Sequence, residues 1–153
     1  MRRFYFPTAD ASIYEEFNSK NAGLDEILEV GKSNDGIDSV RSLIQFNIAS
    51  ISASIMDGTI PASSSFDLKL FIARSDNLRY SQSIDIHIVS SSWVEGTGYY
   101  YQNTNVPYTA SQNPVGGYFE NDGVTWRSRL SASYWNNSGS DFYSSPTTSV
   151  TFG

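Results

Sequence analysis

Two stretches decide the fold of this chain: Ser92-Trp93-Val94-Glu95-Gly96-Thr97-Gly98 and, after an insert, Gly123-Val124-Thr125-Trp126. Tryptophan is the largest apolar side chain and carries one N–H group that needs an acceptor, so its surroundings must be specific. Glycines lie close to both tryptophans, and glycine allows a sharp turn or a close approach of two backbones. The two stretches therefore predict two strand ends that are held together at one edge of a β-sandwich. We call this predicted junction the clasp, and its expected members are Trp93, Glu95, Gly96, Gly123 and Trp126.

The composition favours an all-β chain. Its 153 residues are enough for one domain with a real core, and we expect a single domain over residues 1–153. Only 17% of the residues are charged, against about 25% in an average globular domain, and 26 residues are serine. Serine, threonine and asparagine hydrogen-bond to nearby backbone groups, which weakens helices and suits turns and strand surfaces.

The charge distribution argues against nucleic acid or a membrane as a partner. The formal net charge is −6, and no basic cluster beyond Arg2-Arg3 is available to neutralise phosphates. Apolar runs are only a few residues long, far below the roughly 20 that cross a bilayer. The chain has no cysteine, and its N-terminal residues lack the apolar run of a signal peptide. We therefore expect a protein that is made and assembled in a cytoplasm.

Alternation of apolar and polar residues with a period of two predicts most of the strands. The pattern is clearest over residues 44–48, 66–72 and 84–88. Shorter predicted strands cover residues 3–6, 11–14, 27–30, 98–101 and 124–127, and the alternation at Val150 and Phe152 predicts one more near the end. Only residues 48–56 have roughly helical spacing, and their serines limit the prediction to about one turn over one end of the sandwich.

Residues 99–122 form a polar and aromatic insert between the two tryptophan motifs, which we expect to be an extended loop. A loop of this length in a compact domain is usually functional or held by a partner. Flat aromatic rings stack on sugars, and tyrosine and tryptophan are also enriched at protein interfaces. The residues expected to form an interface or a glycan-binding surface are Tyr99, Tyr100, Tyr101, Tyr108, Tyr118, Tyr134 and Trp135.

No pattern in the sequence indicates catalysis. His87 is the only histidine and falls on the polar face of its predicted strand, which argues against a zinc site or a Ser–His–Asp triad. Two carboxylates about 5–10 Å apart would suit a glycosidase. The acidic residues near the aromatic insert that could supply such a pair are Glu95, Glu120, Asp122 and Asp141. Glu95 follows Trp93 by two residues, which favours an acceptor of hydrogen bonds at a tight corner. We expect no catalytic residues, no cofactor and no metal, and the turn at residues 34–38 is better interpreted as a plain turn than as a calcium loop.

Seven motifs follow one another along the chain: Asp10-Ala11-Ser12-Ile13, Asn21-Ala22-Gly23, Leu28-Glu29-Val30-Gly31, the segment 41–48, the segment 66–72, Trp93-Val94-Glu95-Gly96 and Gly123-Val124-Thr125-Trp126. In this order they resemble the family of DNRLRE-type domains, which is related to the jelly rolls of carbohydrate-binding modules. The resemblance implies an antiparallel β-sandwich of jelly-roll type with a long loop insert.

Two features depart from the pattern of that family. The insert at 99–122 is longer than the usual link, and the sequence ends at Gly153, where the family would still supply closing strands. We therefore expect these strands to be missing from this sequence or to be supplied by a neighbouring subunit, because an unpaired edge strand invites such augmentation.

Domains of this kind resemble modules of secreted bacterial surface proteins, of polysaccharide-degrading enzymes and of tailed-bacteriophage structural proteins. The lack of a signal peptide, of cysteine and of a catalytic constellation favours the bacteriophage setting. We expect a virion structural protein of the capsid surface, neck or tail, assembled in the host cytoplasm with copies of itself and with other virion proteins. The alternative is an extracellular carbohydrate-binding module that binds polysaccharide or a surface glycan through exposed Tyr and Trp side chains.

Overall fold

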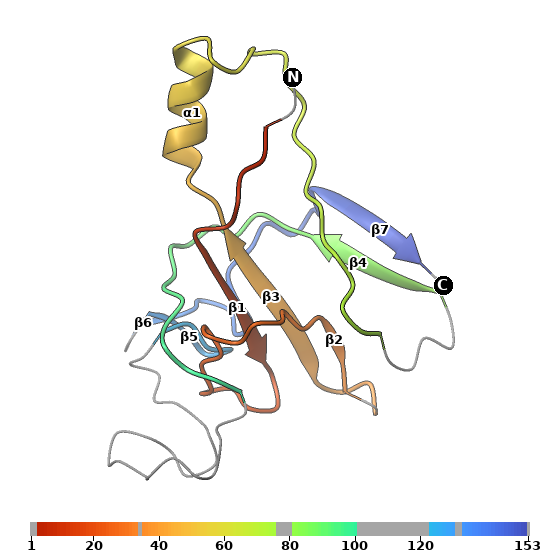
Figure 1. The fold of residues 1–153 in the computed structure, drawn as a ribbon. Helices are drawn as coiled ribbons and strands as arrows, with labels where there is room; N and C mark the ends of the chain where they lie inside the picture. The colour runs from red at the N-terminus through yellow and green to blue at the C-terminus, as the bar shows by residue number, and fades with distance from the viewer. Residues whose placement is uncertain (1–2, 34, 76–80, 101–122, 131–132, 153) are drawn as a thin grey trace.

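The structure is a computed structural model that describes residues 3–33, 35–75, 81–100, 123–130 and 133–152. These residues form a predominantly β protein with one short helix (Figure 1). The elements in chain order are β1 (Ala9–Tyr14), β2 (Gly31–Lys32), β3 (Ser39–Gln45), α1 (Ile48–Met56), β4 (Gln82–Ile86), β5 (Ser128–Leu130), β6 (Ser133–Tyr134) and β7 (Thr148–Phe152). The sequence-based prediction of an all-β fold is confirmed at this level.

The largest sheet has three antiparallel strands in the order β1-β3-β2. Ala11 of β1 pairs with Leu43 of β3, and both side chains are buried. The opposite face of β1 is also covered, because Ser12 is fully buried and its hydroxyl accepts a hydrogen bond from the Glu29 amide at 2.8 Å. The segment before β2 therefore packs over the outer face of β1, which explains why this strand is buried on both sides.

Two smaller antiparallel sheets complete the described structure. In the first, β4 pairs with β7, with Ile84 opposite Val150, and in the second, β5 pairs with β6. An isolated bridge between Val89 and Phe142 lies beyond the end of β4. The described strands thus form three separate sheets, and they do not show the two facing sheets of a jelly roll.

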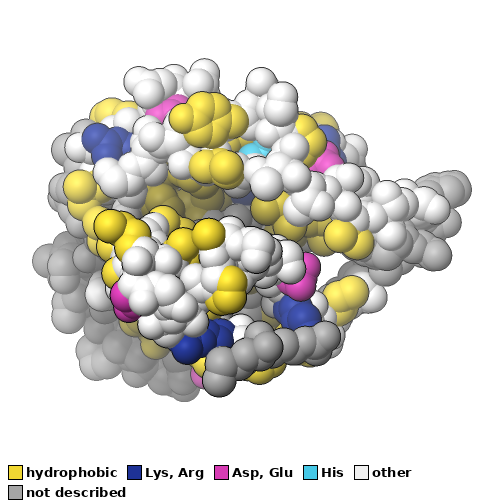
Figure 2. Space-filling model, turned by 90° about the horizontal axis from the view of Figure 1, so that it is seen from above, with side chains coloured by type: hydrophobic (Ala, Val, Ile, Leu, Met, Phe, Trp, Pro, Cys, Tyr) yellow, Lys and Arg dark blue, Asp and Glu magenta, His cyan; other side chains and the backbone are white. Residues whose placement is uncertain are grey.

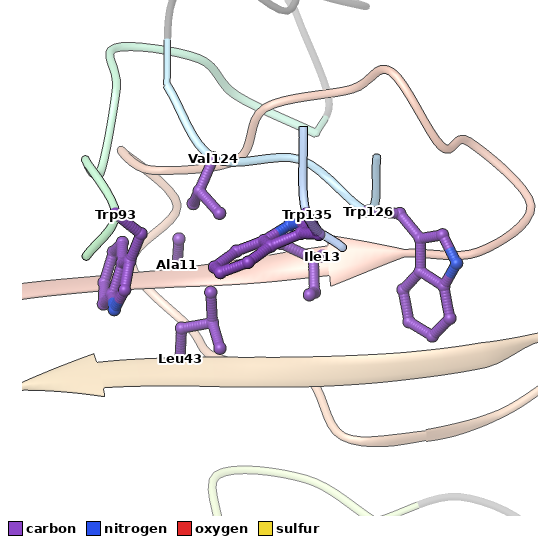
Figure 3. Close-up of a cluster of buried hydrophobic side chains, with 7 residues drawn as sticks. All are labelled: Ala11, Ile13, Leu43, Trp93, Val124, Trp126 and Trp135. Atoms are coloured by element: carbon purple, nitrogen blue, oxygen red, sulfur yellow. The ribbon is translucent and has the colours of Figure 1, made fainter. Parts of the chain in front are cut away.

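The core is built around the three tryptophans of the chain (Figure 3). Trp93 and Trp126 lie toward opposite ends of the cluster, and the Trp135 ring lies between them. The other members are Ala11, Ile13, Leu43 and Val124. A buried Trp removes about 150–250 Å² from water, so three of them give this small cluster most of its apolar area.

Several predicted strands are wrong. Residues 3–6, 27–30, 66–72 and 124–127 are not strands in the structure, and neither are the described residues 98–100 of the fifth. The alternation at 44–48 marks only the end of β3, which begins earlier, at Ser39. The pattern predicted the regions of β1, β4 and β7 correctly to within a few residues, because each of these strands has a partner in the same chain.

The helix α1 is longer than the single turn expected from the sequence. Its N-cap residue is Asn47, whose side chain accepts a hydrogen bond from the Ser50 amide at 2.9 Å and so satisfies one of the free N–H groups of the first turn. None of its nine residues is buried, and it stands away from the strands in Figure 1. Within the described residues, no helix is long and apolar enough to cross a membrane.

Candidate functional site

One buried side chain, that of Asn21, joins the two chain segments that flank residues 99–122. Its Nδ2 donates to the carbonyl oxygen of Glu95 at 2.6 Å and to that of Val124 at 2.7 Å. Its Oδ1 accepts from the Gly98 amide at 2.7 Å. Asn21 is fully buried, so these bonds form without competition from water. Asn21 therefore holds the end of the first tryptophan motif and the start of the second against one loop.

Glycines allow the three backbones to meet at this point. A Cβ atom on Gly23 would lie 2.2 Å from the Glu95 carbonyl oxygen, and one on Gly123 would lie 2.4 Å from the Gly96 Cα. Gly123 also has φ +146° and Gly96 has φ +84°. Residues other than glycine rarely adopt these backbone conformations. Any side chain at Gly23 or Gly123 would push the segments apart.

Glu95 connects the same corner to the start of β1. Its Oε1 accepts a hydrogen bond from the Asp10 amide at 2.8 Å, which is the role expected for it from the sequence. Burial raises the pKa of the neighbouring Asp10 carboxyl, and the negative charge of Glu95 raises it further. The corner therefore places two acidic side chains close together at one end of the sheet.

The two tryptophans of the clasp support this corner from the core. Trp93 and Trp126 belong to the core, and Trp126 is also covered by the Arg41 guanidinium, 4.8 Å from its ring centre. The joining itself is done by Asn21 together with Glu95 and the glycines. Sequence reasoning missed Asn21, because Asn21-Ala22-Gly23 has the composition of an ordinary turn and its partners lie 74 to 103 residues away.

Beside the clasp, Lys20 lies between two aromatic rings. Its Nζ is 3.9 Å from the ring centre of Tyr100 and 4.5 Å from that of Phe17, and it donates to the Tyr100 carbonyl oxygen at 3.2 Å. Asp25 accepts from the Tyr100 amide at 3.1 Å. Burial lowers the pKa of Lys20, and the charge of Asp25 opposes that shift. These contacts fix Tyr100, the last described residue before 101–122, against the body of the protein.

A small cavity of about 130 Å³ lies next to this lysine. Tyr14 and Tyr100 form part of its wall, with ring centres 4.4 Å apart. The Tyr14 hydroxyl is buried and makes no hydrogen bond to any residue that the structure describes. Burial raises the pKa of Tyr14, and the charge of Glu29 adds to the effect. The remaining lining is rich in acidic groups: Glu15, Glu16, Glu29 and Asp38.

The aromatic surface predicted from the sequence is only partly present. Tyr99 and Tyr134 are exposed, and Tyr100 is half-buried beside Lys20. The prediction of an exposed Trp135 is wrong: it is 5% exposed, and its indole N–H donates to the Thr125 carbonyl oxygen at 2.9 Å inside the core. Three further members of the predicted surface lie outside the described residues: Tyr101, Tyr108 and Tyr118.

The acidic candidates for catalysis that the structure describes hold the fold together. Glu95 accepts from the Asp10 amide, and the Asp141 carboxylate accepts from the amides of Asn136 and Asn137 at 3.1 and 2.8 Å. Burial acts to raise the pKa of Asp141, but these bonds, together with those from side chains, outweigh it and lower the pKa. Glu120 and Asp122 lie outside the described residues.

The described residues expose many large apolar side chains. It exposes 22 large hydrophobic side chains, more than twice the ten hydrophobic residues that are buried. On the face in Figure 2, hydrophobic patches are separated mainly by uncharged polar atoms, and acidic and basic groups are few and scattered. Residues 66–72 contribute five of these side chains, and α1 contributes Ile48 and Met56.

Comparisons with known proteins do not assign this chain to a family. No family model matches the chain, and neither a curated protein nor a solved structure matches it. The resemblance to DNRLRE-type domains therefore stays a prediction from the sequence.

Proposed function

We propose that this protein is a structural subunit that works by assembling with copies of itself and with other proteins, and that its setting is the virion of a tailed bacteriophage. The observation that carries the proposal is the exposed apolar surface. Soluble monomers rarely expose large apolar patches, and such patches mark protein–protein contacts more often than chance. The bacteriophage setting rests on the sequence resemblance described above, and the proposal assigns no catalytic role.

The helix α1 supports an assembly function. Isolated helices shorter than about 12–15 residues are marginal in water, and most helices are stabilised by packing an apolar face. α1 has nine residues, and Ile48 and Met56 at its two ends are 64% and 88% exposed. Ile51 and Ile55 are half-buried within the chain, and a neighbouring subunit that covers Ile48 and Met56 would complete the packing of this helix.

The fold that we propose for the assembled protein is a β-sandwich of jelly-roll type. The core around Trp93, Trp126 and Trp135 gives such a sandwich its interior, and the exposed apolar segments are the places where strands from neighbours would be added. In this proposal Asn21 and the clasp together form the base from which the segment 99–122 meets a neighbour.

A carbohydrate-binding module is the second candidate, favoured by the exposed rings of Tyr99 and Tyr134. The two functions are separated by electron microscopy and native mass spectrometry of the purified chain, together with affinity electrophoresis in polysaccharide gels. Assembly predicts regular particles of several subunits and no retardation by polysaccharide. Retardation that is lost in the variants Tyr99→Ala and Tyr134→Ala, in a monomeric protein, would favour the carbohydrate-binding module.

The virion setting has a separate test. We expect the neighbouring genes to encode portal and tail proteins. We also expect to detect the protein in purified phage particles. Neighbouring genes for polysaccharide-degrading enzymes would contradict the virion setting, but they would not contradict the proposed assembly function.

A further inference from the structure

We propose that residues 66–72 form a strand only on association, by pairing in antiparallel fashion with the same segment of a second copy of this chain, about a two-fold axis at Leu68. The inference deepens the proposed assembly function by naming one partner and one contact, and it rests on that function only in requiring self-association.

The segment has the pattern of a strand but no strand partner. Phe66, Leu68, Leu70 and Ile72 alternate with Asp67, Lys69 and Phe71. Among the described residues, no backbone hydrogen bond is formed by residues 66–72. The chain nevertheless runs past the strands as an open trace between α1 and β4 (Figure 1). Unpaired N–H and C=O groups along an extended segment are a template for adding another strand.

The apolar side of the segment is open to solvent as well. Leu68 and Leu70 are 43% and 56% exposed, and Phe66 is 58% exposed. In a half-buried strand, side chains at every second position face an apolar partner. The described residues provide no such partner for this face, so both the backbone and the side chains of the segment are available to another molecule.

Charge selects a second copy as that molecule and fixes the register. In an antiparallel pair centred on Leu68, Asp67 of each copy lies opposite Lys69 of the other, and Phe66 lies opposite Leu70. Opposite charges at directly paired positions are favourable, and like charges there are unfavourable. A pair centred on residue 67 would place Asp67 against itself, and one centred on residue 69 would place Lys69 against itself. Only the register at Leu68 forms two opposite-charge pairs and keeps all the alternating apolar residues on one face.

This arrangement is self-complementary in the manner of a two-fold dimer, in which the same surface of each subunit is used. It resembles strand addition to an open edge, where main-chain hydrogen bonds give affinity and alternate side chains give specificity. The opposite-charge pairs give the contact its register, and the six apolar side chains of Phe66, Leu68 and Leu70 from the two copies share one face of the ribbon.

Engineered cysteines test the two-fold axis directly, because the native chain has no cysteine. Directly opposite residues in an antiparallel pair have Cα atoms about 4.5–5.5 Å apart, within the range that a disulfide spans. Leu68→Cys is therefore expected to form a disulfide-linked dimer under mild oxidation. Leu70→Cys is the matched control, since its two copies would be four residues out of register, about 13 Å apart along the strands. It should cross-link far more slowly at the same protein concentration.

Charge reversal tests the register. Asp67→Lys or Lys69→Asp alone turns both opposite-charge pairs into like-charge pairs, and we expect either to raise the dissociation constant of the dimer about tenfold in sedimentation equilibrium. The double reversal restores the opposite charges and should return this constant to within about twofold of the native value. Circular dichroism of the three variants checks that each is folded, and the exposed positions of both residues favour that result.

The outcomes separate this inference from the function on which it rests. Rapid cross-linking of Leu68→Cys, slow cross-linking of Leu70→Cys and rescue by the double reversal would support the strand pair. Equal cross-linking of the two cysteine variants, or a double reversal as weak as the singles, in a protein that still associates would overturn the strand pair and leave assembly in place. A chain that stays monomeric would overturn both.

Discussion

Replacing Asn21 with alanine removes the side chain that joins the two segments flanking residues 99–122. The native side chain makes three short hydrogen bonds, to the carbonyl oxygens of Glu95 and Val124 and from the amide of Gly98. A buried polar group that loses its only partner costs about 1–3 kcal/mol. Three backbone groups lose this partner, and the Gly23 amide loses a longer bond to Asn21 Oδ1 of 3.4 Å. Water can enter part of the vacated space and satisfy some of these groups. We therefore expect the free energy of unfolding to fall by about 4 kcal/mol, which is less than the sum of the separate costs.

Urea unfolding followed by tryptophan fluorescence measures this loss, since all three tryptophans lie in the core. Asn21→Asp is a matched control that keeps the size and the oxygen acceptor but places a carboxylate against two carbonyl oxygens. That variant should also be destabilised, and more strongly at neutral than at acidic pH, because only its protonated form can donate to a carbonyl oxygen. A loss below about 1 kcal/mol for Asn21→Ala, the value of a single ordinary hydrogen bond, would refute the assignment of Asn21 as the joining residue.

Three further predictions follow from the packing and the charges. Gly123→Ala should lower the free energy of unfolding by about 2–4 kcal/mol, because the new Cβ would meet Gly96 and the residue has φ +146°. Gly31→Ala is the matched control, since it has open space around it, and it should change stability by less than about 0.5 kcal/mol. Trp135→Ala should lose about 3–5 kcal/mol as a core residue, and Tyr134→Ala less than about 1 kcal/mol; the reverse order in thermal melts would show that Trp135 is not in the core. The folded-state pKa of Asp141 is lowered, so its contribution is fully present above the ordinary carboxyl pKa and is lost as the pH falls through the folded value. The stability difference between the native protein and Asp141→Asn should therefore shrink as the pH falls below about 4, and a difference that grows on acidification would contradict the assignment.

The sequence predicted a predominantly β chain because one-sided burial leaves a local signature. The alternation at Ile84 and Ile86 in β4 reflects side chains that are half-buried between exposed neighbours. Residues 66–72 have the same signature, but the structure gives them no partner strand among the described residues. A period of two therefore shows that a segment can have an apolar face, and it does not show whether the partner lies in the same chain.

The site was predictable only in its outline. Close approach at Gly96 and Gly123 follows from the sequence, because glycine beside a buried aromatic residue is a local signal. The role of Asn21 does not, since its hydrogen bonds reach residues far away in the chain. The burial of Trp135 was missed for the same reason: its polar neighbours in the sequence suggested a surface, whereas its partner Thr125 comes from another segment.

The central claim is that this chain covers its exposed apolar surface by assembling with other protein subunits, including its own copies. Sedimentation velocity of the purified protein from about 1 to about 100 μM measures this most directly. The account predicts species that are multiples of 17.0 kDa and that increase with concentration. A single 17.0 kDa species over the whole range, with sharp and cooperative unfolding, would contradict the claim.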